Sequence, residues 1–433
     1  MRRSQTLLLM ALLVSFGLTT MRFSSAAQGP VYAIKNAQIV TMAGPPIERG
    51  TVVIRNGRIA AVGANVSIPG NAQVIEAAGL AVYPGMIDSH TSIGLTEIGQ
   101  VRATVDTTEL GEFNPHMRAI VAVHPASELI PVTRLNGITS VITRPAGGTL
   151  SGQAALINLD GWTWEEMALK PSVGIVFNYP SLRSGRFFDF NTFEFQERSF
   201  ERAKRERDEK LDKIRKLLDD TRAYIKAKEA RSRSFNPDHV LEALIPVVKG
   251  DMPLIVSAER QRDITSAIEF TSEQKVKMIL SGGDEAWKVA SLLKEKNIPV
   301  LLGPILSLPN DEDEPYDQPF TTAKKLLDAG VKFAFQTGDS SNARNLPYHA
   351  AMCVAFGLPR EEALKALTIY PAQIWGVADQ IGSIEVGKLA NLAVWDGDPL
   401  EIRSQVKHLF IKGRSIPLKS KHTELYERYR NRP

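Results

Sequence analysis

Short apolar segments alternate with helical stretches through the middle of this chain. The apolar segments lie at residues 137–143, 172–177, 253–257, 276–280, 298–302 and 331–335. Within the helical stretch 284–297 the apolar residues form one stripe. Gly137, Gly250 and Gly330 each follow a helix and precede a strand, where a left-handed residue is expected. With a further strand at 81–87, the pattern predicts an α/β fold, a parallel (β/α)8 TIM-type barrel.

Both ends of the chain have β-strand character. Strands are expected at residues 31–40, 51–63, 389–395 and 406–411. Asn56 and Gly57 form the dipeptide typical of a two-residue hairpin turn. Strands from opposite ends of a chain commonly complete one unit. We therefore expect a composite β-sandwich domain of residues 28–83 and 380–433, beside a barrel of residues 84–379.

Residues 1–27 have the composition of an export signal. Arg2 and Arg3 precede a short apolar run, and small residues lead up to Ala27. This order is typical of a secretory signal, and the run is too short for a stable membrane span. We expect cleavage near Ala27 and a periplasmic or secreted protein, the alternative being an uncleaved N-terminal anchor. No later stretch is long and apolar enough to span a membrane.

Charge and cysteine content narrow the classes of partner. The formal net charge is +4, and because Arg2, Arg3 and Arg22 precede residue 28, the remaining chain carries only +1. Such a small surplus does not favour nucleic-acid binding. Cys353 is the only cysteine, so no intrachain disulfide can form. An exported chain of this kind is held together by its apolar core.

Residues 194–233 form a highly charged insertion. They include 24 Asp, Glu, Lys or Arg residues among 40 positions, with mixed signs at helical spacing. A thin apolar stripe accompanies the charges. The pattern predicts a solvent-exposed helix against the barrel rim, the alternative being a lid or a partner-binding helix.

Motifs at both ends of the barrel resemble one known family. Val82 to His90 reads Val-Tyr-Pro-Gly-Met-Ile-Asp-Ser-His, and Gly382 to Lys388 reads Gly-Ser-Ile-Glu-Val-Gly-Lys. With the helix at 359–368, these motifs resemble the amidohydrolase superfamily, and most closely its imidazolonepropionase-like branch. The resemblance implies one or two divalent metals at the C-terminal ends of the barrel strands. Such a metal activates a water molecule for hydrolysis of a carbon–nitrogen bond.

The positions that match the family's metal ligands are mostly changed. The family has a His-x-His pair, two further histidines and an aspartate. Here His90 stands at the first position, while Ser92, Ser257 and Gly282 stand where histidines are expected. Asp339 matches the catalytic aspartate. Serine hydroxyls are poor zinc ligands, so the metal site is interpreted as degenerate.

A weaker site remains a candidate. His90, Glu259 and Asp339 could hold one divalent ion, Zn, Mn or Mg, and a site without metal is equally open. Loops at the barrel mouth supply candidates for binding a carboxylate or another acidic group. These substrate-binding candidates are Arg144, Gly147, Gly148, Ser257, Arg260, Asn342 and His349.

Three functional hypotheses follow. The first is a periplasmic hydrolase that cleaves a C–N bond in a small, dipeptide-like or other amide. The second is a catalytically inactive relative that binds a ligand or a partner at the barrel mouth. The third is metal-free chemistry with Asp339 or Glu259 as general base. In each case the expected ligand is a small amide or acidic molecule, and the family resemblance suggests a homodimer.

Overall fold

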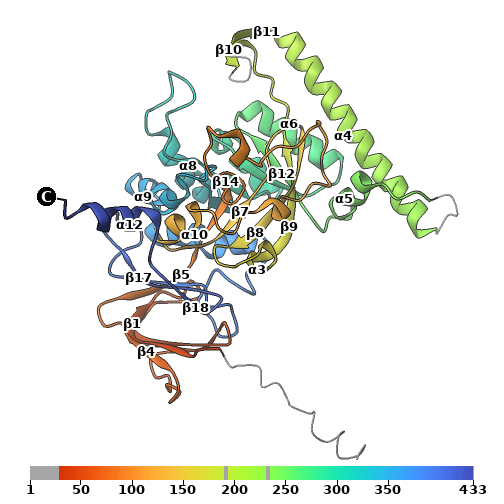
Figure 1. Ribbon diagram of the computed structural model, residues 1–433. Coiled ribbons are helices and arrows are strands. Elements are labelled where there is room, and N and C mark those ends of the chain that lie inside the picture. Colours follow the sequence, from red (N-terminus) through yellow and green to blue (C-terminus); the bar gives the residue numbers. More distant parts are fainter. Residues whose placement is uncertain (1–28, 190–193, 231–234, 433) are drawn as a thin grey trace, which may run out of the picture.

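The computed structural model describes residues 29–189, 194–230 and 235–432. The expected export signal lies outside these residues. Two eight-stranded sheets dominate the described chain, with helices around one of them (Figure 1). Within the described ranges, no helix is both long and apolar enough to cross a membrane.

The larger unit is a nearly closed barrel sheet. Its strand order is β15-β14-β13-β12-β9-β8-β7-β6, and β6 approaches β15. The strands are β6 (Met86–Thr91), β7 (Ile138–Thr143), β8 (Leu150–Asn158), β9 (Ala168–Asn178), β12 (Leu254–Ala258), β13 (Met278–Gly282), β14 (Val300–Leu302) and β15 (Phe333–Phe335). Each of the six predicted apolar segments overlaps a strand, so this part of the prediction is confirmed. Gly137, Gly250 and Gly330 have the expected positive φ angles of 75°, 75° and 72°.

Strand β8 departs from the predicted all-parallel barrel. It runs antiparallel to both neighbours, β7 and β9. Residues 144–149 are all that join β7 to β8, and a parallel connection needs a crossover of a dozen or more residues. The prediction of a fully parallel sheet is therefore wrong at this strand.

Apolar side chains from successive strands fill the barrel interior. Ile142, Val176, Ile255 and Leu301 belong to this inner cluster, which Trp375 closes at one end. A larger cluster lies between the strands and the surrounding helices. These helices are α2 (Leu129–Arg134), α3 (Trp164–Met167), α5 (His239–Val248), α6 (Gln261–Glu273), α7 (Ala290–Glu295), α8 (Gln318–Asp328), α9 (Leu346–Ala355), α10 (Arg360–Leu367) and α11 (Ile369–Ile374).

The second sheet joins both ends of the chain. It contains β1 (Tyr32–Ile39), β2 (Ile47–Arg55), β3 (Arg58–Gly63), β4 (Gln73–Glu76), β5 (Ala81–Pro84), β16 (Leu392–Trp395), β17 (Val406–Ile411) and β18 (Arg414–Ile416). β5 pairs with β16 and so links the two ends. The hydrogen bonds form one sheet, where we predicted a sandwich. The single strand expected at 81–87 is divided, since β5 belongs to this sheet and β6 to the barrel.

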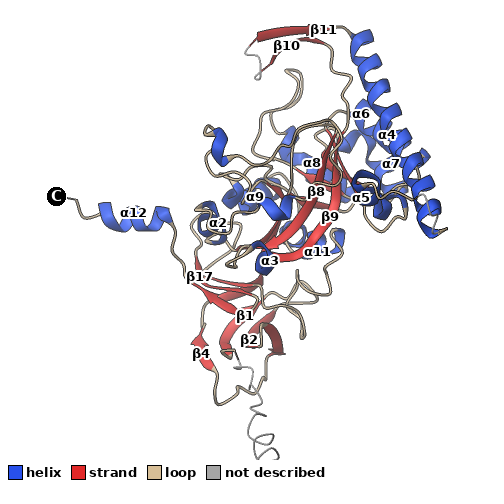
Figure 2. Ribbon diagram, turned by 45° about the vertical axis from the view of Figure 1, so that its right-hand side comes forward, coloured by secondary structure: helices blue, strands red, loops and turns tan. Residues whose placement is uncertain are grey.

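The charged insertion forms a long helix. Helix α4 (Phe200–Glu229) runs along the side of the barrel and packs against α5 (Figure 2). Its buried face includes Leu211, Ile214 and Leu218. A two-stranded hairpin of β10 (Gly185–Asp189) and β11 (Glu194–Arg198) precedes it, which the sequence pattern did not predict.

A short helix, α12 (Lys421–Tyr429), ends the described chain. It contacts α2 at the edge of the barrel and extends outward from there (Figure 2). A capping box at Ser420 and Thr423 begins it, and none of its residues is buried.

Candidate functional site

The C-terminal ends of the barrel strands carry a polar cluster. His90 lies near the end of β6, and Arg144 directly follows β7. Parallel pairing of β12 and β13 places Ser257 beside Ser281. Gln336, which follows β15, accepts a hydrogen bond of 3.0 Å from the Ser281 hydroxyl. Residues distant in sequence therefore meet because parallel strands end on the same face of the barrel.

Arg144 reaches across this cluster. Its guanidinium donates hydrogen bonds of 2.8 Å to Ser281 Oγ and 3.4 Å to Ser257 Oγ. Burial lowers the pKa of Arg144 to about 10, while the nearby carboxylate of Glu259 opposes that shift. The side chain therefore keeps its positive charge at neutral pH. A single fixed cation occupies the mouth between the two serines.

His90 lies deep in the same mouth. Burial lowers its pKa well below the ordinary value, and the positive charge of Arg144 adds to the effect. The imidazole is therefore neutral at pH 7. Its Nδ1 atom is buried and has no hydrogen-bond partner among the described residues.

Glu259 interacts electrostatically with Arg144. Desolvation in the concave mouth raises the pKa of Glu259 to about 7, although part of its surface reaches solvent. The negative charge of Asp284 is the second cause. The backbone N–H of Asp284 donates to Glu259 Oε2 at 3.3 Å. Gly282 leaves space for this carboxylate, because a Cβ atom at that position would collide with it. The family's histidine position is thus better represented by Ser281, whose hydroxyl lies in the cluster, than by Gly282.

Asp339 is held by contacts within its own loop. Its carboxylate accepts hydrogen bonds of 2.9 Å from Ser341 N and 2.7 Å from Asn342 Nδ2. Two of the predicted site residues, Asp339 and Asn342, are therefore bonded to each other. Together they order the loop that follows β15.

Asp88 is a buried carboxyl group below this loop. It accepts hydrogen bonds from the backbone N–H groups of His90 and Thr337, both at 3.1 Å, and from the Thr337 hydroxyl. Burial raises its pKa to about 7, although these three hydrogen bonds act in the opposite direction. Asp88 thus ties the end of β6, and with it His90, to the segment after β15.

Gly147 and Gly148 lie in the loop between β7 and β8. Both have positive φ angles, 79° and 59°. Their carbonyl groups accept hydrogen bonds from Asn178 Nδ2 at 3.4 Å and 2.9 Å. A Cβ atom on Gly148 would come within 2.9 Å of the carbonyl oxygen of Gly111. Close packing accounts for these two glycines.

His349 is buried below the mouth. It lies on α9, and its Nδ1 accepts a hydrogen bond of 3.2 Å from the backbone N–H of Ile305. Burial lowers its pKa to about 4, so it accepts this bond as a neutral ring at pH 7. Its contact is with the loop after β14.

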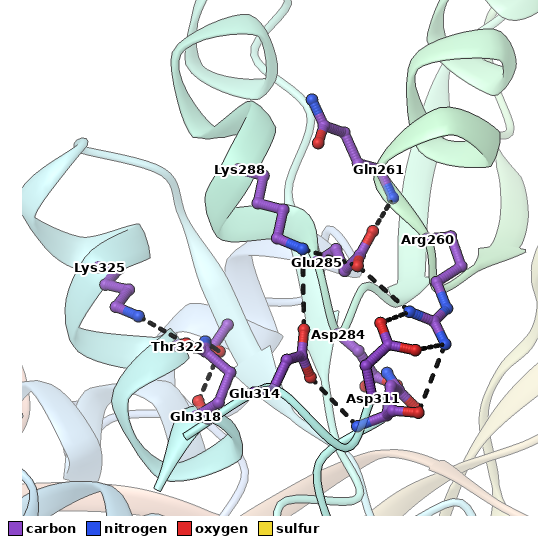
Figure 3. Close-up of polar contacts among 11 residues, drawn as sticks. Arg260, Gln261, Asp284, Glu285, Lys288, Asp311, Glu314, Gln318, Thr322 and Lys325 are labelled. Carbon is purple, nitrogen blue, oxygen red and sulfur yellow. Dashed lines mark hydrogen bonds and ion pairs between the residues drawn. The ribbon is translucent and has the colours of Figure 1, made fainter. Parts of the chain in front are cut away.

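Arg260 belongs to a salt-bridge network at the rim of the mouth (Figure 3). It contacts Asp311 and lies 3.4 Å from Glu285. Lys288 lies 2.8 Å from Glu285 and 3.7 Å from Glu314. Glu285, Asp311 and Glu314 are the single group of three potential ligands with atoms within 4.8 Å of one another that the described residues contain. Two cations, Arg260 and Lys288, already form ion pairs with these three carboxylates.

The residues at the mouth do not fit a divalent metal. His90, Glu259 and Asp339 do not form a group of ligand atoms within 4.8 Å in the described structure. Both serine hydroxyls accept from Arg144, which brings a positive charge to the position that a metal would take. A divalent ion about 4 Å from a guanidinium would be repelled by about 8 kcal/mol at an effective dielectric constant of 20.

Three residues of the cluster were missed or undervalued in the sequence. Asp88 stands two positions before His90 in the motif, a spacing that places both at the end of one strand. Ser281 directly precedes Gly282, and only the strand register shows which of the two lies beside Ser257. Gln336 gives no signal in the sequence, because its role depends on contacts with β13 and with the carbonyl of Gly303.

Comparison with known proteins agrees with this architecture. The sequence profile of the Amidohydrolase family matches residues 81–416. Amidohydrolase tasK of Hapsidospora irregularis is 23% identical over 401 residues, 84% of this chain and 39% of that protein. Imidazolonepropionase of Maricaulis maris is 27% identical over 192 residues, 42% of this chain and 45% of that enzyme. The chain thus spans less than half the length of these curated relatives.

Solved structures of other proteins share the fold of this chain. An amidohydrolase from Thermotoga maritima is 28% identical, with a TM-score of 0.78 over 89% of this chain and 99% of that one. A Xaa-Pro dipeptidase with bound methionine is 16% identical, with a TM-score of 0.55 over 89% and 99%, and shows the fold alone. Members of this family usually bind a divalent metal. The profile match covers most of the sequence, and the chain therefore belongs to the amidohydrolase family.

Proposed function

We propose that this family member binds a small acidic or amide-containing molecule at its barrel mouth, through Arg144, and does not hydrolyse it by metal catalysis. One observation carries the proposal: the Arg144 guanidinium donates to Ser257 and Ser281 at the strand ends where the family resemblance implies metal ligands. A charged guanidinium is a strong donor to carboxylates and polarises carbonyl oxygens.

The surroundings of Arg144 leave it able to bind a ligand. A guanidinium has five N–H donors, and two of them are bonded to the serines. A cavity of about 1670 Å³ begins at Ser257 and Glu259 and extends toward α4 and α6. Arg207 and Arg262 line its outer part. A ligand with a carboxylate would meet Arg207 and Arg262 along this path, and it would reach Arg144, which does not itself line the cavity, past Ser257.

A metal-independent hydrolase of small amides is the second candidate function. Glu259 favours it, because its pKa of about 7 suits a general base near neutral pH. In that case Glu259 would accept a proton from the attacking water, and Arg144 would stabilise negative charge on the carbonyl oxygen. Some relatives are named as hydrolases, among them N-acyl-D-aspartate deacylase of Alcaligenes xylosoxydans xylosoxydans. Their names are compatible with a hydrolytic role for this chain, retained or altered.

The proposal is tested by metal analysis and ligand binding on the same purified protein. We expect well below one equivalent of bound metal per chain after the protein is incubated with Zn and Mn and the free ions are removed by dialysis. N-acetylated amino acids should raise the melting temperature of the wild type and not of the Arg144→Met variant. Arg55→Met is the matched control, because Arg55 is exposed at the end of β2, in the other sheet.

Two outcomes would overturn this proposal or replace it with the second candidate. Stoichiometric zinc that is lost on His90→Ala, together with amide hydrolysis, would show that the family's metal chemistry is retained. Hydrolysis that persists without metal and disappears in Glu259→Gln would establish the metal-independent enzyme.

We also propose, from the N-terminal sequence, that the protein is exported to the periplasm or beyond. The support is the order of charge, apolar run and small residues before residue 28. N-terminal sequencing of the protein recovered from the periplasm should find a start near residue 28. A start at residue 1 in the membrane fraction would instead show an uncleaved anchor.

A further inference from the structure

A second cavity lies at the opposite end of the barrel from Arg144. Its volume is about 970 Å³. The segments that lead into β12, β13, β14 and β15 form its wall, together with residues 373–376 at the end of α11. This is the N-terminal end of the strands, away from the face that carries active sites in barrels of this type. The cavity is therefore independent of the site proposed above.

The lining of this cavity is strongly basic. Six lysines and one carboxylate, that of Asp251, contribute to it, a formal surplus of five positive charges. The lysines are Lys170, Lys275, Lys277, Lys294, Lys296 and Lys332. Over the whole chain the surplus is only +4. Positive charge is thus concentrated in one concave surface.

Few of these ammonium groups are neutralised. Lys296 lies 3.0 Å from Glu295, and Lys170 and Lys332 donate to uncharged oxygens. The side chains of Lys275, Lys277 and Lys294 form no ion pair or hydrogen bond with any residue that the structure describes. All three are exposed at the cavity. Like charges held together in this way repel one another unless an anion joins them.

Glycines keep the space beside two of these lysines open. A Cβ atom on Gly330 would lie 3.4 Å from Lys294 Nζ, and one on Gly250 would lie 3.9 Å from Lys277 Cε. Both glycines end helices in the left-handed conformation, with φ angles of 72° and 75°. The lysine side chains therefore extend along the wall of the cavity past glycine backbone.

Helix C-termini explain part of this arrangement but not all of it. Helices α5, α6, α7, α8 and α11 end at the cavity, and each contributes about half a negative charge from its unpaired carbonyl groups. Together these helix ends offset only about half of the surplus of five. An anionic ligand would balance the rest.

We propose that this cavity binds a small molecule that carries two or more phosphate groups. Lysine ammonium groups bind phosphate as point charges, and phosphate oxygens accept from several donors at once. The volume lies at the upper end of the range for small-molecule pockets. A concave site of this size favours a small soluble polyphosphate over a flat lipid surface, although both carry the same phosphate chemistry.

Calorimetric titration with inorganic tripolyphosphate tests this proposal. The triple variant Lys275→Gln, Lys277→Gln, Lys294→Gln should bind at least about tenfold more weakly than the wild type, since each lost ion pair weakens binding severalfold. The matched control is Lys204→Gln, Lys213→Gln, Lys216→Gln on α4, which removes the same charge elsewhere. It should change the affinity less than about twofold.

Three results would overturn the proposal. Tripolyphosphate that fails to bind the wild type at low salt would do so directly. Equal weakening of tripolyphosphate binding by the two triple variants would show a general effect of charge and no specific binding site. Binding only to phosphatidylglycerol vesicles, lost in the cavity variant, would assign the lysines to a membrane surface. The replaced lysines are exposed, so unchanged circular dichroism is expected for both triple variants.

Discussion

The position of Arg144 makes a quantitative prediction about zinc. We consider the variant Ser92→His, Ser257→His, Ser281→His, which restores imidazoles at three strand ends while His90 is kept. If Arg144 is retained, its guanidinium lies within about 4 Å of any ion held there, because imidazole ligands place zinc about 2 Å away. The repulsion between the two cations is about 8 kcal/mol at an effective dielectric constant of 20.

This repulsion corresponds to a large factor in affinity. At about 1.4 kcal/mol for each tenfold change, 8 kcal/mol is between five and six orders of magnitude. The further change Arg144→Met removes the charge and frees the space between β12 and β13. The quadruple variant should therefore bind zinc at least about a thousandfold more tightly than the triple variant, even if half of the repulsion is relieved by movement of the arginine.

Competition with a chromophoric zinc chelator measures both affinities directly. Arg144→Met alone is the control, since it removes the charge without adding ligands, and it should bind zinc no better than the wild type. Equal zinc affinity of the triple and quadruple variants would refute the reasoning, because it would show that the guanidinium does not occupy the metal position. Circular dichroism and chemical denaturation establish that each variant is folded.

Three further predictions concern stability. Gly282 has a φ angle of 91° and leaves room for the carboxylate of Glu259, so Gly282→Ala should lower the free energy of unfolding by about 1–3 kcal/mol in urea titrations. Burial raises the pKa of Asp88 from 3.8 to about 7, so the folded chain keeps a proton that the unfolded chain releases. The contribution of Asp88 to stability therefore falls as the pH rises from about 4 to about 7. Asp88→Asn should remove this dependence of the free energy of unfolding on pH, which is at most about 1.4 kcal/mol per pH unit. Identical pH profiles for the wild type and the variant would contradict this. His349 has a pKa lowered to about 4 and accepts from the N–H of Ile305, so its contribution is complete above about pH 6.5 and is lost toward pH 4. His349→Ala should lower the free energy of unfolding by about 1–3 kcal/mol at pH 7. The variant should also lose less stability than the wild type when the pH falls from about 6.5 to about 4, as measured by denaturation at several pH values.

Much of the fold could be predicted because its signals are local. The apolar segments between helices become strands, and the turn at Asn56 and Gly57 has the positive φ angles, 52° and 78°, that its dipeptide predicts. The antiparallel strand β8 was not predicted. Its only sequence signal is the shortness of residues 144–149, which excludes a crossover helix once both flanking strands are known.

The candidate site was less predictable because its members meet through tertiary structure. The family resemblance identified His90, Ser257 and Glu259 as residues of the mouth, since each lies at or just after the C-terminal end of a strand. Arg144 was proposed only as a ligand for an acidic group. Its actual partners, Ser257 and Ser281, depend on the direction of a long side chain across the barrel, which no local pattern specifies.

The changes at the metal positions are best understood as one coupled set. A guanidinium has donors and no acceptor, so it needs acceptors around it, which serine hydroxyls supply. Serines are also much smaller than histidines, and the volume they free is what the side chain of Arg144 occupies. Neighbouring residues that share a contact do not contribute additively to stability. Returning Ser257 or Ser281 to histidine while Arg144 is kept would therefore crowd the guanidinium and remove an acceptor. Restoring the metal site requires Arg144 to change with the serines.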